Sequence, residues 1–349
     1  MPKPKIRIIA TGGTIASAEA AGGLAPQLTG AELAAFVPQA SELAELDIVQ
    51  PMNIDSTNMH PENWRRIADA ILERYDDYDG FVVLHGTDTM AYTAAALSYL
   101  IQDSPRPIVL TGSQQPMGSP FTDARLNLYQ SVLYAADPAS RDVTVVFGGK
   151  VIAGTRARKQ RTMSFNAFTS VNYPDLALIR NDKIIRTAPE PATHARGQEP
   201  TASLAEPSAH AAANPLRLTS RLNERVIVLK LTPGVSARTL DLLRHDYDAI
   251  ILETFGIGGI PDTLRNAIFA WVDSGRTLVV TTQVPEEGLD LGVYEVGRPY
   301  SEHPAILQGA DMTCEALVAK TMWALGQTSD PAKIRELFLR PVNHDRLPA

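Results

Sequence analysis

Short runs of isoleucine and valine alternate along this chain with longer segments whose apolar residues recur at helical spacing. This alternation is typical of an α/β protein with a largely parallel sheet, because each strand leads into a helix that crosses back over the sheet. In the first half we predict strands at 5–10, 46–52, 80–86, 106–112 and 142–149. We predict helices at 28–37, where Thr29 and Glu32 form a capping box, and at 60–75, 90–101 and 123–136.

Three successive predicted strands, 80–86, 106–112 and 142–149, end in polar turns that contain glycine. In open α/β sheets, ligands bind outside the carboxyl ends of the strands. We therefore expect the functional site at that edge of the first sheet.

The composition changes between the two halves of the chain, where proline and alanine replace large apolar residues. Such a segment cannot bury much surface, so we predict a linker at 188–222 between domains at 1–187 and 223–349. In the second domain we predict strands at 225–231, 247–255 and 276–283, and helices at 236–245, 263–275, 312–326 and 329–339.

Length and charge narrow the class of protein. A chain of 349 residues is long enough for two cores, and its net charge of −7 disfavours nucleic acid as a partner.

The single cysteine, Cys314, excludes an internal disulfide and favours a reducing compartment. The first apolar run, Ile6–Ala10, is shorter than the roughly 7–15 residues of a signal peptide, and no run approaches the ~20 residues of a membrane span. We expect a cytoplasmic protein without a membrane partner.

The stretch ATGGTIA at 10–16 is the first candidate site. Gly12 and Gly13 let backbone N–H groups face an anion or a developing oxyanion, with Thr11 and Thr14 beside them. A tight turn with threonine caps explains the same residues. The stretch lacks the glycine spacing of a nucleotide-binding loop.

The second candidate is HGTDT at 85–89. A threonine hydroxyl needs a neighbour to take its proton, and a carboxylate with an amine can form such a relay. Asp88 lies beside Thr87, and Lys159 belongs to the basic run RARKQR, which on its own is better explained as a solvated surface.

A third stretch, NIDSTNM at 53–59, places Asp55, Ser56 and Thr57 after a strand, where on their own they form a turn. None of the seven histidines has metal-ligand spacing and there is no second cysteine, so we expect no metal site and no cofactor.

Together, TGGTIA, NIDSTNM and HGTDT at these spacings resemble the bacterial-type L-asparaginase family. Residues 75–100 and 309–320 resemble its cytoplasmic type I branch, and the similarity covers nearly all of the chain outside 188–220. The resemblance implies a larger N-terminal domain with a mixed, mostly parallel sheet and a smaller, flavodoxin-like C-terminal domain with a parallel sheet. It also implies a homodimer or homotetramer that converts L-asparagine to L-aspartate and ammonia, with a lesser activity on glutamine.

Carried over residue by residue, the resemblance makes Thr14 the nucleophile that forms an acyl-threonine. Thr87, Asp88 and Lys159 become a second polar relay. The implied substrate-binding residues are Asp55, Ser56, Thr57, Gly86 and, for the α-amino group, Asp88.

One departure concerns the loop after the first motif, where many relatives carry a tyrosine that assists the nucleophile and this chain has Leu24. Either another group activates Thr14 or the catalytic activity is weak. If the activity is weak, the protein could instead be an asparagine sensor.

A further alternative is an amidotransferase component that supplies ammonia for misacylated tRNA. Such relatives carry an extra domain before the TGGT motif, which here begins at residue 11.

Overall fold

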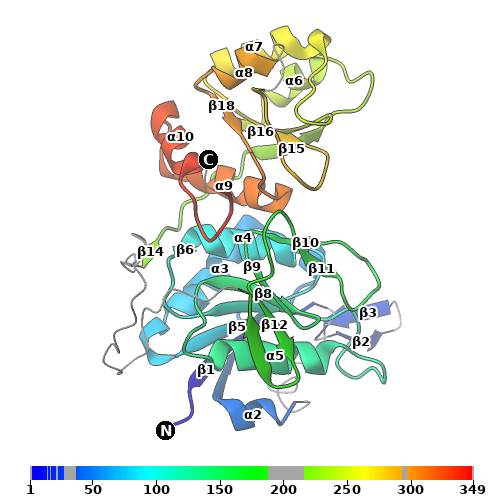
Figure 1. The fold of residues 1–349 in the computed structure, drawn as a ribbon, viewed down its shortest axis with the longest axis vertical. Helices are drawn as coiled ribbons and strands as arrows, with labels where there is room; N and C mark the ends of the chain where they lie inside the picture. The colour runs from blue at the N-terminus through cyan, green and yellow to red at the C-terminus, as the bar shows by residue number, and fades with distance from the viewer. Residues whose placement is uncertain are drawn as a thin grey trace. The chain divides into compact units, whose positions relative to one another are not determined.

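The computed structural model describes residues 2–13, 15, 17–20, 23–26, 37–187, 216–292 and 297–347, with backbone alone for 17–20 and 23–26. The chain divides into two compact units (Figure 1). The larger unit comprises Met1–Ser170 and Pro174–Thr219, and the smaller comprises Val171–Tyr173 and Ser220–Ala349.

The larger unit is built on an eight-stranded sheet in the order β13-β12-β9-β8-β7-β5-β1-β4. Its parallel part consists of β4 (Glu45–Val49), β1 (Lys5–Ala10), β5 (Gly80–Leu84), β7 (Ile108–Thr111) and β8 (Val143–Phe147). These are the strands predicted from the apolar runs, and β5, β7 and β8 are buried throughout. The mixed, mostly parallel sheet predicted for this unit is confirmed.

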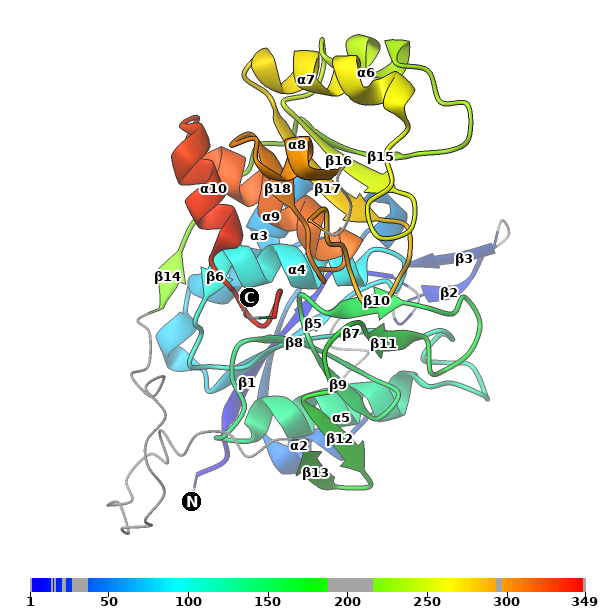
Figure 2. The same ribbon diagram turned by 45° about the horizontal axis from the view of Figure 1, so that its top comes forward.

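Helices cover both faces of this sheet, as Figures 1 and 2 show. α3 (Pro61–Leu72) packs on α4 (Met90–Leu100), and α4 packs on β7 and β8. α5 (Ala124–Ala136) packs on β1, β5, β7 and β8 and contacts α2 (Ala40–Leu43). α4 is buried along almost its whole length, because it contacts α3, β6 (Ile101–Gln102) and β10 (Ala157–Lys159) as well as the sheet. The predicted helix at 28–37 and its capping box lie almost entirely outside the described residues.

The antiparallel part of this mixed sheet lies beyond β8, in strands that the apolar runs of the sequence did not predict. Gly148 and Gly149 both have positive φ, +59° and +77°, and turn the chain into a two-residue hairpin. The hairpin partner is β9 (Lys150–Ala153), and β12 (Ala177–Arg180) and β13 (Lys183–Arg186) extend that edge. In the chain between β9 and β12, β10 (Ala157–Lys159) pairs with β11 (Phe168–Ser170).

Further short elements lie near the predicted loops. β2 (Ser17–Ala20) pairs antiparallel with β3 (Gly23–Pro26). Two 3-10 turns lie at Ser56–Asn58 and Tyr75–Asp77. Within the predicted linker, β14 (Arg217–Leu218) pairs with β6 (Ile101–Gln102) of the same unit.

The smaller unit contains a four-stranded parallel sheet in the order β15-β16-β17-β18. Its strands are β15 (Val226–Lys230), β16 (Ala249–Thr254), β17 (Thr277–Thr282) and β18 (Ile306–Gln308). Its helices are α6 (Arg238–Leu243), α7 (Arg265–Asp273), α8 (Arg298–Ser301), α9 (Cys314–Gln327) and α10 (Pro331–Leu339), with a 3-10 turn at Asp262–Leu264. The parallel sheet was predicted, whereas β18 and α8 were not. Asp330 caps α10 by accepting a hydrogen bond from the Ala332 N–H (2.9 Å), as its sequence indicates.

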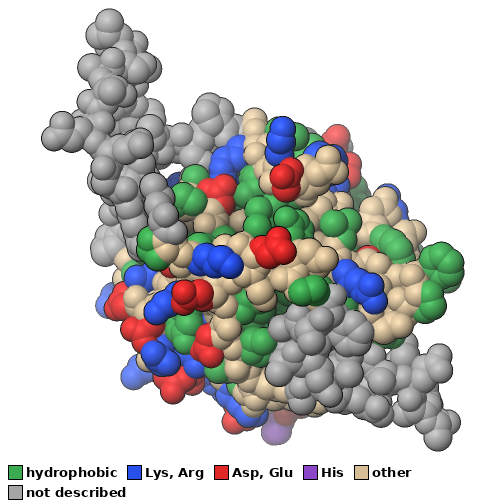
Figure 3. All heavy atoms as spheres, turned by 90° about the horizontal axis from the view of Figure 1, so that it is seen from below, with side chains coloured by type: hydrophobic (Ala, Val, Ile, Leu, Met, Phe, Trp, Pro, Cys, Tyr) green, Lys and Arg blue, Asp and Glu red, His purple; other side chains and the backbone are tan. Residues whose placement is uncertain are grey.

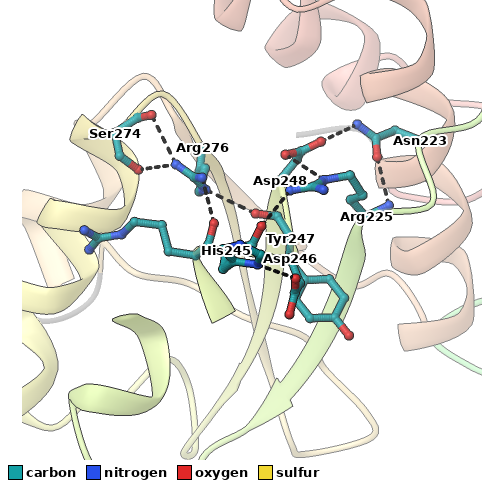
Figure 4. Close-up of polar contacts among 9 residues, drawn as sticks. Asn223, Arg225, His245, Asp246, Tyr247, Asp248, Ser274 and Arg276 are labelled. Atoms are coloured by element: carbon teal, nitrogen blue, oxygen red, sulfur yellow. Dashed lines mark hydrogen bonds and ion pairs between the residues drawn. The ribbon is translucent and has the colours of Figure 1, made fainter. Parts of the chain in front are cut away.

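A polar cluster closes the amino end of the smaller sheet (Figure 4). Arg276 donates to the carbonyl oxygens of Arg244 (2.7 Å) and Tyr247 (3.2 Å), which follow α6 and lack helical partners. Arg225 is paired with the Asp248 carboxylate at 3.2 Å. Because these charges are satisfied by backbone groups and by one another, we assign the cluster a structural role.

On the molecular face drawn in Figure 3, lysine and arginine side chains are interspersed with aspartate and glutamate. Among the described residues, no helix combines the length and apolar character that crossing a bilayer requires.

Candidate active site

Three polar loops meet at the carboxyl edge of the larger sheet, because β4, β1 and β5 are adjacent parallel strands. The Thr11 N–H and hydroxyl both donate to the Leu84 carbonyl, at 3.0 and 2.9 Å. Gly13 N–H donates to the Ile54 carbonyl (3.1 Å), and Ile54 N–H donates to the Thr11 carbonyl (2.9 Å). The loop after β1 is thereby bonded to the loop after β4 and to the last residue of β5.

Glycine is required where these loops touch. Gly13 has φ +82°, and a Cβ at this position would lie 2.3 Å from the Gly86 Cα. A Cβ on Gly86 would lie 2.4 Å from the Ser56 hydroxyl. Real side chains do not tolerate such contacts, so the glycines let three motifs distant in sequence pack together.

The loop after β4 is braced by its own side chains. Asp55 Oδ1 accepts hydrogen bonds from the Thr57 N–H (2.8 Å) and the Thr57 hydroxyl (2.9 Å). Ser56 is 3% exposed, and its carbonyl accepts a hydrogen bond from the Thr89 hydroxyl (2.8 Å). Thr89 of the HGTDT motif thus holds Ser56 in place beside Gly86.

Thr87, Asp88 and Lys159 form a hydrogen-bonded group. Lys159 Nζ lies 2.7 Å from the Thr87 hydroxyl oxygen and 2.7 Å from Asp88 Oδ1. The Asp88 side chain is 57% exposed and that of Lys159 is 17% exposed. Lys159 is the last residue of β10, so the hairpin absent from the sequence prediction is what brings this lysine to the loop after β5.

His85 is the buried support of this loop, a role that the sequence did not indicate. Its ring is 0% exposed, and Nδ1–H donates to the Gly86 carbonyl at 2.7 Å. Nε2 then accepts from the Thr93 hydroxyl (2.9 Å), whose oxygen accepts from the Trp64 indole N–H (3.0 Å). Burial lowers the pKa of His85 from 6.5 to about 4, and the bond to Gly86 opposes that shift only in part. The neutral Nδ1–H form therefore satisfies every partner.

The bond from His85 also fixes the direction of the Gly86–Thr87 peptide. The peptide is trans, so its carbonyl and N–H point in opposite directions. With the Gly86 carbonyl turned to His85, the Thr87 N–H points away from the ring. In the described part of the chain this N–H makes no hydrogen bond, which suits an oxyanion.

Gln114 also contacts the group formed by Thr87, Asp88 and Lys159. The sequence did not indicate this residue, because the predicted strand and its polar turn ended at Gly112. The Thr87 hydroxyl donates to Gln114 Oε1 at 3.2 Å. The available signal was the polar stretch SQQ directly after a buried strand at the expected edge.

Two predicted features are not placed. Thr14 lies outside the described residues, and Leu24 is described only by its backbone, which pairs with Glu19 in the β2–β3 hairpin. Among the residues that the structure describes, no cluster of three or more His, Cys, Asp or Glu side chains could hold a metal ion.

The two α/β units and the converging loops define a protein with a polar site at the carboxyl edge of its larger sheet. Family profiles match both halves: "Asparaginase, N-terminal" at residues 5–191 and "Glutaminase/Asparaginase C-terminal domain" at 225–338. The chain belongs to the asparaginase family.

Individual relatives agree with this assignment. The L-asparaginase of Thermococcus kodakarensis is 36% identical over 341 residues, covering 97% of this chain and 98% of that protein. The solved structure of the thermostable L-asparaginase from the same organism superposes with a TM-score of 0.87 at 34% identity, over 99% of this chain and 100% of that one. A component of the glutamyl-tRNA(Gln) amidotransferase of Metallosphaera sedula is 33% identical, over 96% of this chain and 75% of that protein.

Proposed function

We propose that this protein is an L-asparaginase that hydrolyses L-asparagine to L-aspartate and ammonia, with a lesser activity on L-glutamine. The observation that carries the proposal is the position of Lys159 Nζ, 2.7 Å from both Thr87 and Asp88, in a member of the asparaginase family. An amine between a hydroxyl and a carboxylate is the arrangement that proton transfer to and from a hydroxyl needs.

The reaction proceeds in two steps. The Thr14 hydroxyl attacks the side-chain amide carbon, its proton leaves with the amide nitrogen, and ammonia departs from an acyl-threonine. Water then attacks the ester, releasing aspartate and restoring the hydroxyl. The Thr87 N–H stabilises the oxyanion in both steps, and His85 holds that peptide in position.

The proposed relay follows from the two contacts of Lys159. Lys159 can pass a proton to Asp88 along one 2.7 Å contact and take one from Thr87 along the other. Thr87 then becomes the base for the attacking hydroxyl or water.

The polar groups around the relay suit an α-amino acid. Among the described residues Lys159 engages only Oδ1 of Asp88, which leaves Oδ2 for the α-ammonium group. We assign the α-carboxylate to Ser56, with Asp55 and Thr57 alongside and Gly86 giving the ligand close access to the backbone.

The test is ammonia release by purified protein with L-asparagine and L-glutamine. Turnover of asparagine should disappear in Thr14→Ala and Thr87→Ala, whereas Thr232→Ala, an exposed threonine of the smaller unit, should match wild type. Activity that survives in both site variants would refute the assignment of these residues.

Two other functions make different predictions in the same assay. An amidotransferase component, suggested by the Metallosphaera relative, would release ammonia only with its partner. An asparagine sensor, suggested by Leu24, would bind asparagine without turnover. Steady turnover by the isolated protein contradicts both.

We further propose a cytoplasmic homodimer or homotetramer that takes a small-molecule substrate, with no cofactor, nucleic-acid or membrane partner. The domain limits we propose are 1–187 and 223–349 with a linker at 188–222; the family profiles, at 5–191 and 225–338, support them. Sedimentation equilibrium measures the number of protomers, and limited proteolysis within 188–222 tests the linker.

A further inference from the structure

The loop after β7 carries a side chain that the proposed reaction does not yet use. Gln114 Oε1 lies 3.2 Å from the Thr87 hydroxyl oxygen, the same atom that Lys159 Nζ approaches to 2.7 Å. Thr87 is therefore held between an ammonium group and an amide.

The charges on these groups fix the direction of each hydrogen bond. A lysine ammonium can only donate, so the Thr87 oxygen accepts from Lys159. The hydroxyl has one proton, which must go to another acceptor. In the described part of the chain that acceptor is Gln114 Oε1. Gln114 thus decides where the Thr87 proton points in the resting site.

The backbone of Gln114 is held by a buried carboxylate. Asp123, 7% exposed, accepts from the backbone N–H groups of Gln114 (3.0 Å) and Gln115 (3.1 Å) and from the Asn127 amide (3.1 Å). Asn127 also donates to the Gly112 carbonyl and accepts from the Gly148 N–H, both at 3.0 Å. The ends of β7 and β8 are thereby tied to the loop that presents Gln114.

The second polar atom of the Gln114 amide has no partner among the residues that the structure describes. Nε2 is buried and makes no hydrogen bond to any described residue, and leaving such a donor unpaired is unfavourable. The terminal torsion of glutamine is soft, so the amide can turn over and present Nε2–H to Thr87. That orientation is the correct one once the Thr87 proton has left, because a deprotonated oxygen needs a donor.

We infer that Gln114 is a positioning residue that accepts a hydrogen bond from the Thr87 hydroxyl in the resting site and donates one to the Thr87 oxygen after Thr87 has given up its proton. The inference rests on the proposed function, since it assigns Thr87 a proton transfer. It goes beyond that function by adding a residue and a loop to the relay.

The first test compares Gln114→Met with Gln115→Met. Gln115 is exposed and contributes only backbone groups to the loop, so it is a matched control. Loss of one neutral hydrogen bond predicts a kcat for Gln114→Met roughly 3- to 10-fold below wild type, with KM within about twofold. Gln114→Glu keeps an acceptor but loses the donor, and is also expected below wild type. A wild-type kcat in Gln114→Met would overturn the inference, and a wild-type kcat in Gln114→Glu alone would overturn its donor half.

The second test does not depend on turnover. A double-mutant cycle with Thr87→Val and Gln114→Met should be non-additive by roughly 3- to 10-fold in the unfolding equilibrium constant, because both changes remove the same hydrogen bond. An additive cycle would overturn the contact. If wild type fails to hydrolyse asparagine, the proposed function and the role of Gln114 in turnover both fall, and the cycle still decides whether the contact exists.

Discussion

Replacing the buried histidine of the HGTDT motif is expected to change how the stability of the fold depends on pH. His85 is 0% exposed, donates to Gly86 and accepts from Thr93, so its neutral ring fits the folded state. Burial lowers its pKa from 6.5 to about 4. His85→Gln removes the titrating group and keeps hydrogen-bonding atoms at the site.

The direction of the change in stability follows from the pH at which the ring binds a proton in the folded and in the unfolded state. Above about pH 6.5 the ring is neutral in both states, and its contribution to stability is complete. As the pH falls, the unfolded chain takes up a proton that the folded protein accepts only near pH 4, so stability is lost between those values. From about pH 7 to about pH 5 the loss is about 2 kcal/mol, at 1.36 kcal/mol per unit of pKa difference.

The assay is urea unfolding followed by 19F NMR of protein labelled with 5-fluorotryptophan. Trp64 is the tryptophan of the larger unit and donates to Thr93 in the same network, so its signal reports the right region. Wild type should lose about 2 kcal/mol more than His85→Gln between the two pH values. The exposed His245→Gln should behave as wild type. Equal losses in wild type and His85→Gln would refute the reasoning.

Two other substitutions test the site directly. Lys159→Met should lower kcat roughly 100-fold or more, because it removes a general acid–base group. The neighbouring Arg158→Met should keep the wild-type kcat. Ammonia release measures kcat for both variants, and circular dichroism checks that both are folded. Gly13→Ala should destabilise the protein by at least about 1–3 kcal/mol, because its φ is +82° and its Cβ would lie 2.3 Å from Gly86. A Cβ on Gly118 would meet no atom within 4 Å, so Gly118→Ala should have a melting temperature near that of wild type in calorimetry. Equal melting temperatures for Gly13→Ala and Gly118→Ala would contradict the packing argument.

The helices and parallel strands could be predicted because their signals are local. The residues of β5 and β8 are almost all apolar, which indicates strands buried along their whole length. In α3, the spacing of Trp64 and Ile67 indicates the buried face of the helix. The antiparallel edge was missed because Gly148–Gly149 serves equally well as a loop and as a hairpin, and only pairing with β9 decides between them.

The sequence by itself determined the two α/β units and the sheet edge at which the threonine motifs lie, because strand period and turn residues are encoded within a few positions. Only the tertiary structure decided that Lys159 lies within hydrogen-bonding distance of both Thr87 and Asp88, and that His85 and Gln114 hold Thr87 from two sides. Those contacts join residues from different strands and loops, at distances set by sheet order and by glycines such as Gly13 that let loops touch. Hydrogen bonds of about 3 Å depend on that packing, which no short stretch of sequence specifies.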